Sequence, residues 1–364
     1  MNETKIEFLS DEWWHEYEAV QLGTFINEGL IIALPLCFPE LTVPIPAAES
    51  CITSLDVTDD GVIYGGTSGS ASHAFVARVH SVSGHVLDLG KLDDCISCPA
   101  IVCGKNNVII CANNNDTGKI FIQKMGSMPG DDIQECVFVK YPIENIGVPI
   151  KNEQILHAVA DKNRNFIIGT TPNYIFKVDI DKKEISILSE AKNIGKLVLG
   201  SNGTIYGMEE DNSLWKYDST MGNIIRKEIF LPGEHWNNGT SCWTRDLNSN
   251  GLYIADSHGQ IYHFTEKDKY FTPIAKCMSG PVTTMSVTFD GRLFGFCGEG
   301  ISSLFCYNPK TKTLKNLGCA ASTIGKRRLG YIFGDSVVGR DGYIVFGEND
   351  NFGHLWLYFP RIMG

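Results

Sequence analysis

The chain has 364 residues, of which 43% are hydrophobic and 20% charged, and it carries a formal net charge of -11. This composition is typical of a folded protein with a large core. The negative charge and the absence of any run of Lys and Arg argue against a nucleic-acid partner or an anionic membrane partner.

The N-terminal residues predict a cytoplasmic protein. Met1–Glu7 has no basic region followed by an apolar stretch, as a secretory signal would. The apolar run Leu30–Cys37 is too short and comes too late for a signal peptide or a membrane span.

The first predicted strand covers residues 19–25 and ends in Leu22-Gly23. The segment 26–50 contains prolines and is expected to be irregular.

From residue 51 onward, a unit of four strands recurs with a period of roughly 40 to 50 residues, which is the signature of propeller blades. In each copy a turn joins the first strand to a second strand of the type Ile-Tyr-Gly, and the third strand is rich in aromatic residues. The turns are at Gly61, Asn107, Arg164, Gly203, Gly251, Gly291 and Gly342. The predicted blades cover 51–95, 96–150, 151–191, 192–233, 234–279, 280–322 and 323–364.

The seventh copy ends after its third strand, so it lacks a fourth. Residues 19–25 are expected to supply that strand, because their Leu-Gly end matches the fourth strands that end at Leu89-Gly90 and Leu317-Gly318. Pairing them with the last blade closes the ring and leaves no exposed sheet edge. The sequence therefore predicts an all-β protein, a single seven-bladed β-propeller of four antiparallel strands per blade, over residues 1–364.

Twelve cysteines are scattered through the chain, and several fall at apolar strand positions. We expect reduced core thiols rather than disulfides. Cys95 and Cys98, with Cys103 and Cys111, have a spacing that suggests zinc. Because Cys103 and Cys111 fall at core positions and no second CxxC follows, no metal site is predicted there.

The seven copies can be aligned with one another, and Arg245 breaks its column. The residues six positions before each turn are Leu55, Ile101, Ala158, Leu197, Arg245, Met285 and Ser336. A guanidinium among apolar positions is costly unless it is paired or faces water. Two interpretations stand side by side: a structural ion pair with Asp246 or Asp256, and a ligand-binding arginine.

The loops between second and third strands and between blades emerge on one face, where propellers place their sites. His73 and His354 open the third strands of the first and last blades, which touch once the ring closes. Blade five carries His235, Trp236, Trp243 and His258, and blade seven carries Arg327, Arg328 and Tyr331. The tryptophans either stack on a sugar ring or pack between blades. The loop charges are either solvated or line a locally positive mouth together with Arg245.

The segment Tyr64-Gly-Gly-Thr67-Ser-Gly with His73, and the run from Phe333 to Pro360, resemble seven-bladed carbohydrate-active propellers. These include ulvan lyases, rhamnosyl-glucuronate lyases and related rhamnosidases. The resemblance implies that two histidines, a tyrosine and an arginine act on an acidic oligosaccharide by β-elimination. His235, His258, Tyr331 and Arg245 are the matching candidates, although their tyrosine-to-arginine spacing, the many cysteines and the lack of a signal peptide depart from the pattern.

In this hypothesis Arg245 neutralises the uronate carboxylate, His258 or His235 takes the C5 proton and Tyr331 protonates the leaving oxygen. The substrate would be held by His73, Trp236, Trp243, Arg327, Arg328 and His354. A propeller that binds a ligand or a protein without chemistry is the alternative, since the fold hosts both kinds. A third interpretation is metal-assisted chemistry on a divalent cation held by His73, His354 and Asp350. No other cofactor is expected.

Overall fold

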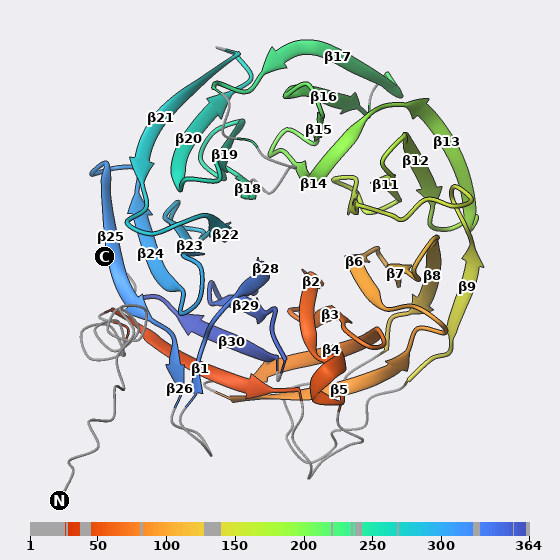
Figure 1. Cartoon of the computed structure of the whole chain (residues 1–364), viewed down its shortest axis with the longest axis horizontal. Coiled ribbons are helices and arrows are strands. Elements are labelled where there is room, and N and C mark those ends of the chain that lie inside the picture. The colour runs from red at the N-terminus through yellow and green to blue at the C-terminus, as the bar shows by residue number, and fades with distance from the viewer. Residues whose placement is uncertain are drawn as a thin grey trace, which may run out of the picture.

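The structure is a computed structural model of the chain. It describes residues 26–361 except for residues 27, 37–44, 81–82, 127–139, 220, 234–235, 237–241, 268, 323–327 and 352. Within these residues, seven four-stranded antiparallel sheets are arranged around a central axis (Figure 1). The predicted all-β seven-bladed propeller is confirmed.

Each blade presents its first strand to the central axis and its fourth strand to the outside (Figure 1). The innermost strands are β2 (Cys51–Val57), β6 (Ser97–Cys103), β10 (His157–Ala160), β14 (Asn193–Leu199), β18 (Cys242–Arg245), β22 (Val282–Val287) and β28 (Phe333–Val338). The second strands are β3 (Ile63–Ser68), β7 (Asn107–Asn113), β11 (Phe166–Thr170), β15 (Ile205–Glu209), β19 (Gly251–Ala255), β23 (Leu293–Cys297) and β29 (Ile344–Glu348).

The third strands are β4 (His73–His80), β8 (Gly118–Lys124), β12 (Tyr174–Asp179), β16 (Ser213–Asp218), β20 (Gln260–Thr265), β24 (Ser303–Asn308) and β30 (His354–Phe359). The outer strands are β5 (Ser83–Lys91), β9 (Ile143–Gly147), β13 (Glu184–Glu190), β17 (Asn223–Phe230), β21 (Tyr270–Lys276), β25 (Thr313–Cys319) and β1 (Leu30–Pro35). A short 3-10 helix, η1 (Ala47–Glu49), precedes β2, and β26 (Ala321–Ser322) pairs with β27 (Arg328–Leu329). Among the residues that the structure describes, no helix is long and apolar enough to cross a membrane.

An N-terminal strand closes the ring, but its position differs from the prediction. The strand that pairs with β30 is β1, with Leu30 opposite Phe359 and Pro35 opposite His354 (Figure 1). The predicted closing segment, residues 19–25, lies outside the described residues. The strand that covers the outer edge of β30 has to present apolar side chains to the core of the last blade. The apolar run that begins at Leu30 does so, since Ala33 is buried in that core. A Leu-Gly ending therefore did not locate the strand.

The recurring glycine of the second strand has a packing role in four blades. It lies directly opposite a buried aromatic residue of the third strand in the pairs Gly65–Phe75, Gly169–Phe176, Gly207–Trp215 and Gly295–Phe305. A Cβ atom at any of these glycines would meet the ring across the strand at a distance too short for a real contact. The motif lets a large ring lie flat over the neighbouring strand, where its burial stabilises the blade.

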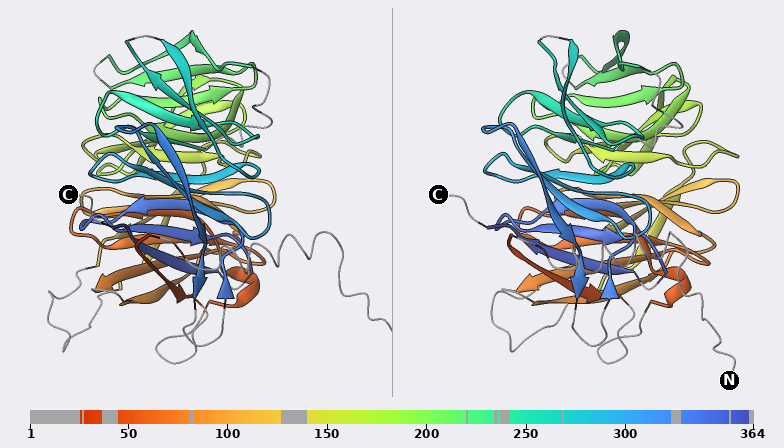
Figure 2. Two further views of the ribbon diagram at one scale, coloured as in Figure 1. Left: turned by 90° about the vertical axis from the view of Figure 1, so that its left-hand side faces the viewer. Right: turned by 60° about the vertical axis from the view of Figure 1, so that its left-hand side comes forward.

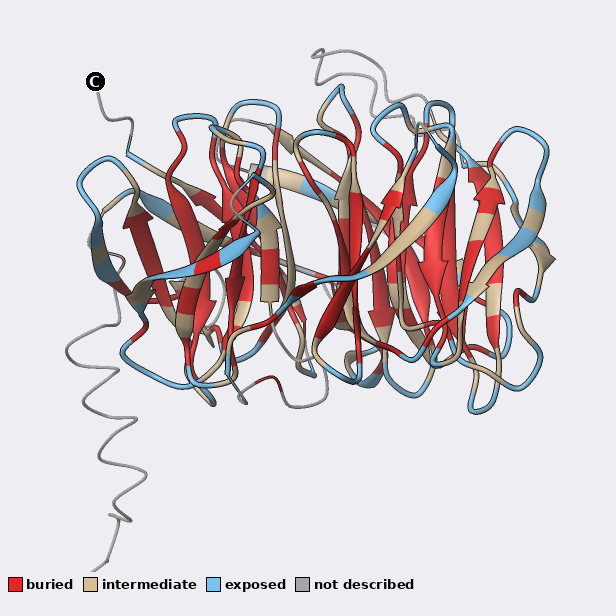
Figure 3. Cartoon of the chain, turned by 90° about the horizontal axis from the view of Figure 1, so that it is seen from above, coloured by how far each residue is buried: buried red, intermediate tan, exposed pale blue. Residues whose placement is uncertain are grey.

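The core lies between neighbouring blades. Clusters of buried side chains combine residues of adjacent sheets, such as Val102 of β6 with Phe176 of β12. Seen edge-on, the buried residues fill the middle of the disc and the exposed ones gather at its two faces (Figure 3). The ten described cysteines are all free and eight are buried, which confirms the prediction of core thiols.

The strand directions define the two faces of the disc. We call the face that carries the turns between first and second strands the turn face. We call the opposite face, which carries the loops between second and third strands and the connections between blades, the loop face. The side views show the disc between these faces, with η1 on its rim (Figure 2). The loop face is where the repeat pattern of the sequence predicts the functional residues.

Candidate functional site in the central channel

The inner strands surround a channel with a cavity of about 460 Å³. Its wall is made by residues of β2, β6, β10, β14, β18, β22 and β28, together with the turns between β2 and β3 and between β10 and β11. Sites for small ligands have volumes of roughly 300–1,000 Å³, so the channel is large enough for one.

Arg245 lies in this channel with its guanidinium unpaired. It is the last residue of β18, and its side chain is accessible to solvent. It forms no hydrogen bond or ion pair with any residue that the structure describes. Partial desolvation within the channel lowers the pKa of Arg245, and nearby Asp56 opposes that shift. An arginine nonetheless stays charged at neutral pH.

The two carboxylates considered as structural partners of Arg245 are engaged elsewhere. Asp246 accepts hydrogen bonds from Ser249 Oγ at 2.6 Å and from Asn248 N at 2.9 Å, and it pairs with His263 Nε2 at 3.0 Å. Asp256 accepts from the backbone N–H groups of its own loop. The structural interpretation of Arg245 as half of an ion pair with Asp246 or Asp256 is therefore wrong.

Two other cations of the channel do have partners. Lys196 of β14 extends across the channel to β28, where its Nζ donates to Gly334 O at 2.6 Å and lies 3.5 Å from Asp335 Oδ1. Arg164 in the turn after β10 donates to Cys103 O at 3.0 Å and to Val57 O at 2.9 Å. These bonds join side chains to the backbone of other blades and hold both cations in place.

Two titratable side chains of the channel wall, Asp56 and His157, have shifted pKa values. Asp56 accepts from Cys103 N at 2.7 Å and Val57 N at 2.8 Å, and burial raises its pKa although Arg164 and these bonds act in the opposite direction. His157 Nδ1 accepts from Leu197 N at 3.1 Å. Burial, helped by nearby Lys196, lowers the pKa of His157 to about 3, so its ring is neutral at physiological pH. A neutral ring that accepts at Nδ1 carries its proton on Nε2.

The structure does not bring the proposed catalytic residues together. Arg245 is opposite Leu252, whereas His258 lies three residues beyond Ala255, the last residue of β19. At about 3.3 Å per residue, strand β19 alone separates their levels by roughly 10 Å. Tyr331 precedes β28, so it lies at the loop face with His258, and Arg245 lies near the turn face. The idea that Arg245 shares one mouth with the loop residues is wrong, because β18 runs away from the loop face.

Both tryptophans of blade five are buried between blades. Trp236 is 4% exposed, packs on Tyr262 and donates from Nε1 to Pro232 O at 2.9 Å. Trp243 is 8% exposed within the same cluster. This arrangement is the packing alternative considered from the sequence, and neither indole offers an open face for a sugar ring.

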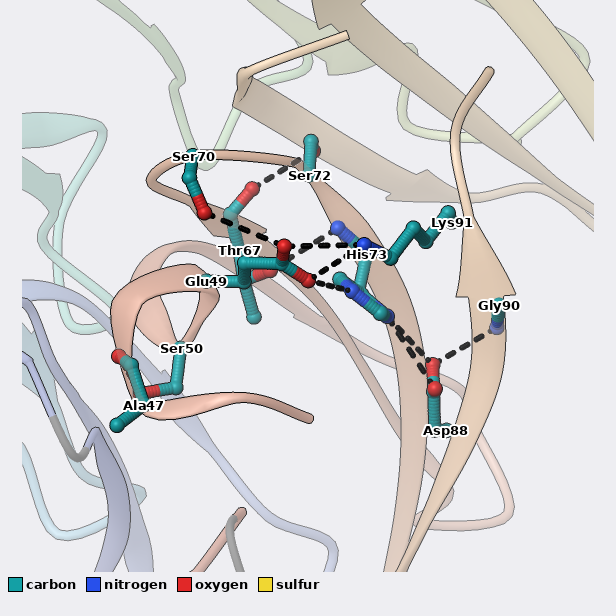
Figure 4. A network of polar contacts seen from close by, with 10 residues as sticks. All are labelled: Ala47, Glu49, Ser50, Thr67, Ser70, Ser72, His73, Asp88, Gly90 and Lys91. Carbon is teal, nitrogen blue, oxygen red and sulfur yellow. Dashed lines mark hydrogen bonds and ion pairs between the residues drawn. The ribbon is translucent and has the colours of Figure 1, made fainter. Parts of the chain in front are cut away.

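The two histidines at the ring closure are paired with carboxylates. His73 is 3% exposed and lies between Glu49 and Asp88 (Figure 4). His354 Nδ1 is 3.0 Å from Glu348 Oε2. Both nitrogens of His73 are thus occupied, which argues against the metal-assisted interpretation. No group of three or more His, Cys, Asp or Glu among the described residues is arranged to hold a metal ion.

Several predicted residues cannot be placed. His235 and Arg327 lie outside the described residues, and only the backbone of Arg328 is described. Lys196, Asp335 and Asp56 are not among the residues predicted from the sequence. A signal was present, because the column seven positions before each turn is mostly polar and all its members line the channel: Ser54, Ala100, His157, Lys196, Thr244, Thr284 and Asp335.

Comparisons with known proteins support the fold. Neither a protein-family model nor a curated protein sequence matches the chain. Among solved structures, the chain is similar to an extracellular domain from B. thetaiotaomicron described as part of a hybrid two component system, with a TM-score of 0.60 and 10% identity over 92% of this chain. The chain spans only 40% of that protein's length. It is also similar to the WD40 beta propeller domain of Doa1, with a TM-score of 0.59 and 8% identity, covering 91% of this chain and 96% of that one. Identities this low show the propeller fold alone.

Proposed function

We propose that this propeller is a binding protein whose central channel holds a small ligand with a carboxylate, and that Arg245 is the anchor. The observation that carries the proposal is the unpaired guanidinium of Arg245 in a water-accessible cavity of about 460 Å³. Its N–H donors have no partner among the described residues, so they are available to the two oxygens of a ligand's carboxylate.

The chemistry of the wall supports a polar, carboxylate-bearing ligand such as a uronate unit. The planar guanidinium binds a carboxylate through two parallel hydrogen bonds. Lys196 and His157 also line the channel as donor residues, and Asp335 lines it with a carboxylate that can accept from a hydroxyl group. An acidic monosaccharide matches this set better than a neutral one, because only the acidic sugar pairs with Arg245.

Binding without chemistry is favoured over β-elimination. Elimination needs a carboxylate-binding group, a base and an acid around one sugar ring. Arg245 lies near the turn face, and His258 and Tyr331 lie at the loop face, so a single uronate cannot contact all three.

The proposal predicts salt-sensitive binding that depends on Arg245. In calorimetric titrations, glucuronate should bind at low salt and bind more weakly in 0.5 M NaCl, because salt screens the charge pair. Arg245→Gln should weaken binding by about tenfold or more, since a hydrogen bond to a charged group is worth about 1.5–3 kcal/mol. Arg340→Gln is the matched control, because Arg340 is an exposed turn-face residue outside the channel wall.

Two outcomes would overturn the proposal. Glucose binding as tightly as glucuronate, with no effect of salt or of Arg245→Gln, would exclude an anionic ligand in the channel. Release of an unsaturated uronate from an acidic oligosaccharide, lost in His258→Ala, would instead support the lyase hypothesis.

A further inference from the structure

The short helix η1 forms the joint between the first and last blades. Toward blade one, Ala48 O accepts a hydrogen bond from Ser70 N at 2.9 Å. Toward blade seven, Ser50 Oγ accepts from Gly353 N at 2.9 Å. The segment that leads into β2 is therefore hydrogen-bonded to both the first and the last blade.

The side chain of Glu49 ties this joint to blade one through a buried histidine (Figure 4). His73 Nε2 is 2.8 Å from Glu49 Oε2, and His73 Nδ1 is 3.1 Å from Asp88 Oδ1. Lys91 Nζ lies 2.9 Å from Glu49 Oε2, and Ser70 Oγ donates to Glu49 Oε1 at 3.2 Å. The side chain of His73 is 4% exposed and that of Glu49 11%, so water screens this pair little.

We propose that His73 is a proton-operated latch on the closure of the ring. When its imidazole is protonated, it holds η1 against blade one through Glu49 and Asp88 together. When it loses that proton, η1 loses this tie to blade one and keeps only its bonds with Ser70 and Lys91, so the joint between the first and last blades loosens.

The number of donors on the ring explains the switch. An imidazolium has two N–H groups and can donate to Glu49 and Asp88 at once. A neutral imidazole has one N–H, so its other nitrogen presents a lone pair to a carboxylate oxygen. The charged groups around the ring are Glu49 from η1 and Asp88 and Lys91 from β5. Lys91 helps to keep Glu49 ionised, so loss of the His73 proton leaves carboxylates that the ring can no longer satisfy.

The direction of the pH effect follows from these contacts. Burial alone lowers the pKa of His73, but the hydrogen bonds with Asp88 and Glu49 outweigh it and raise that pKa above its usual value near 6.5. The stabilisation is therefore complete below about pH 6.5, the value for an unfolded histidine, and is lost as the pH rises through the folded pKa. The hydrogen bond with His73 lowers the pKa of Glu49 below 4.5, so the latch also weakens in acid, as the pH falls through that lowered value.

Hydrogen exchange of the full-length chain tests the latch. After correction for intrinsic exchange, amides of residues 45–52 and of β1 should lose protection several-fold between pH 6 and pH 9. In His73→Gln the same amides should be equally protected at both pH values, because glutamine does not titrate. His263→Gln is the control, since His263 also pairs with a carboxylate, Asp246, but lies in blade five. It should keep the wild-type pH dependence at the joint.

Asp88→Asn serves as a second variant if His73→Gln does not fold, and it should reduce the pH dependence at the joint because one of the two carboxylates is gone. The latch is overturned if wild-type residues 45–52 are equally protected at pH 6 and pH 9, or if His73→Gln retains the wild-type change.

Discussion

A chain that begins at residue 37 is expected to lose its cooperative unfolding transition, whereas a chain that begins at residue 26 keeps it. The first deletion removes β1 and exposes the main-chain groups of β30 along the last blade. Each hydrogen bond lost costs about 1 kcal/mol, and the buried contacts of Ala33 and Leu36 are lost as well. The total approaches the roughly 5–15 kcal/mol that stabilise a typical protein.

Circular dichroism melting of the two shortened chains distinguishes the observed closing strand from the one expected at residues 19–25. Only the chain without β1 should show a broad transition or aggregate, because an open sheet edge invites pairing with other molecules. A sharp, wild-type-like transition in the chain that begins at residue 37 would show that β1 does not close the ring.

Replacing Gly207 by alanine is expected to lower the free energy of unfolding by about 3 kcal/mol, combining overpacking and the strain on a buried hydrogen bond. The added methyl group would collide with the indole of Trp215, which is fully buried. Moving that ring breaks the hydrogen bond from Trp215 Nε1 to Asn193 Oδ1, which measures 3.0 Å. Chemical denaturation measures the loss.

Two comparisons isolate the collision. Gly222→Ala adds a methyl group where nothing lies within 4 Å, although its φ of +67° disfavours a side chain, so it should cost only about 1 kcal/mol. In the background of Trp215→Leu, Gly207→Ala should cost much less than in the wild type, because the indole is gone. Equal costs in both backgrounds would rule out the clash as the reason for the glycine.

The fold could be predicted because each blade repeats the same physical solution. Turn glycines such as Gly61, with φ +87°, and strand glycines such as Gly65 recur at corresponding positions of several blades, so one sequence supplied its own alignment. The closing strand has no such repeat to support it. Only its pairing with the edge strand β30 identifies it. The Leu-Gly ending was too weak a signal to distinguish residues 19–25 from Leu30–Pro35.

The candidate site was only partly predictable. Arg245 could be found because it is the one charged residue among the seven that stand six positions before each turn. A charge at such a position needs an ion-pair partner, water or a ligand. Its separation from His258 depends on the direction of β18, which carries Arg245 to the end of the strand that is far from the loop face. The burial of His73 depends on Glu49, which comes from an irregular segment, and no periodic pattern connects that segment with β4 or β5.

The pairing of β1 with β30 also constrains how the protein is made. Leu30 leaves the ribosome long before its partner Phe359 exists, so β1 must wait without its sheet while six other blades are synthesised. Contacts this distant along the chain form slowly. A chain interrupted before β30 could build its earlier blades but could not close, and its unpaired N-terminal strand would remain available to chaperones and proteases. The closing strand thus makes the completion of the ring depend on the synthesis of β30.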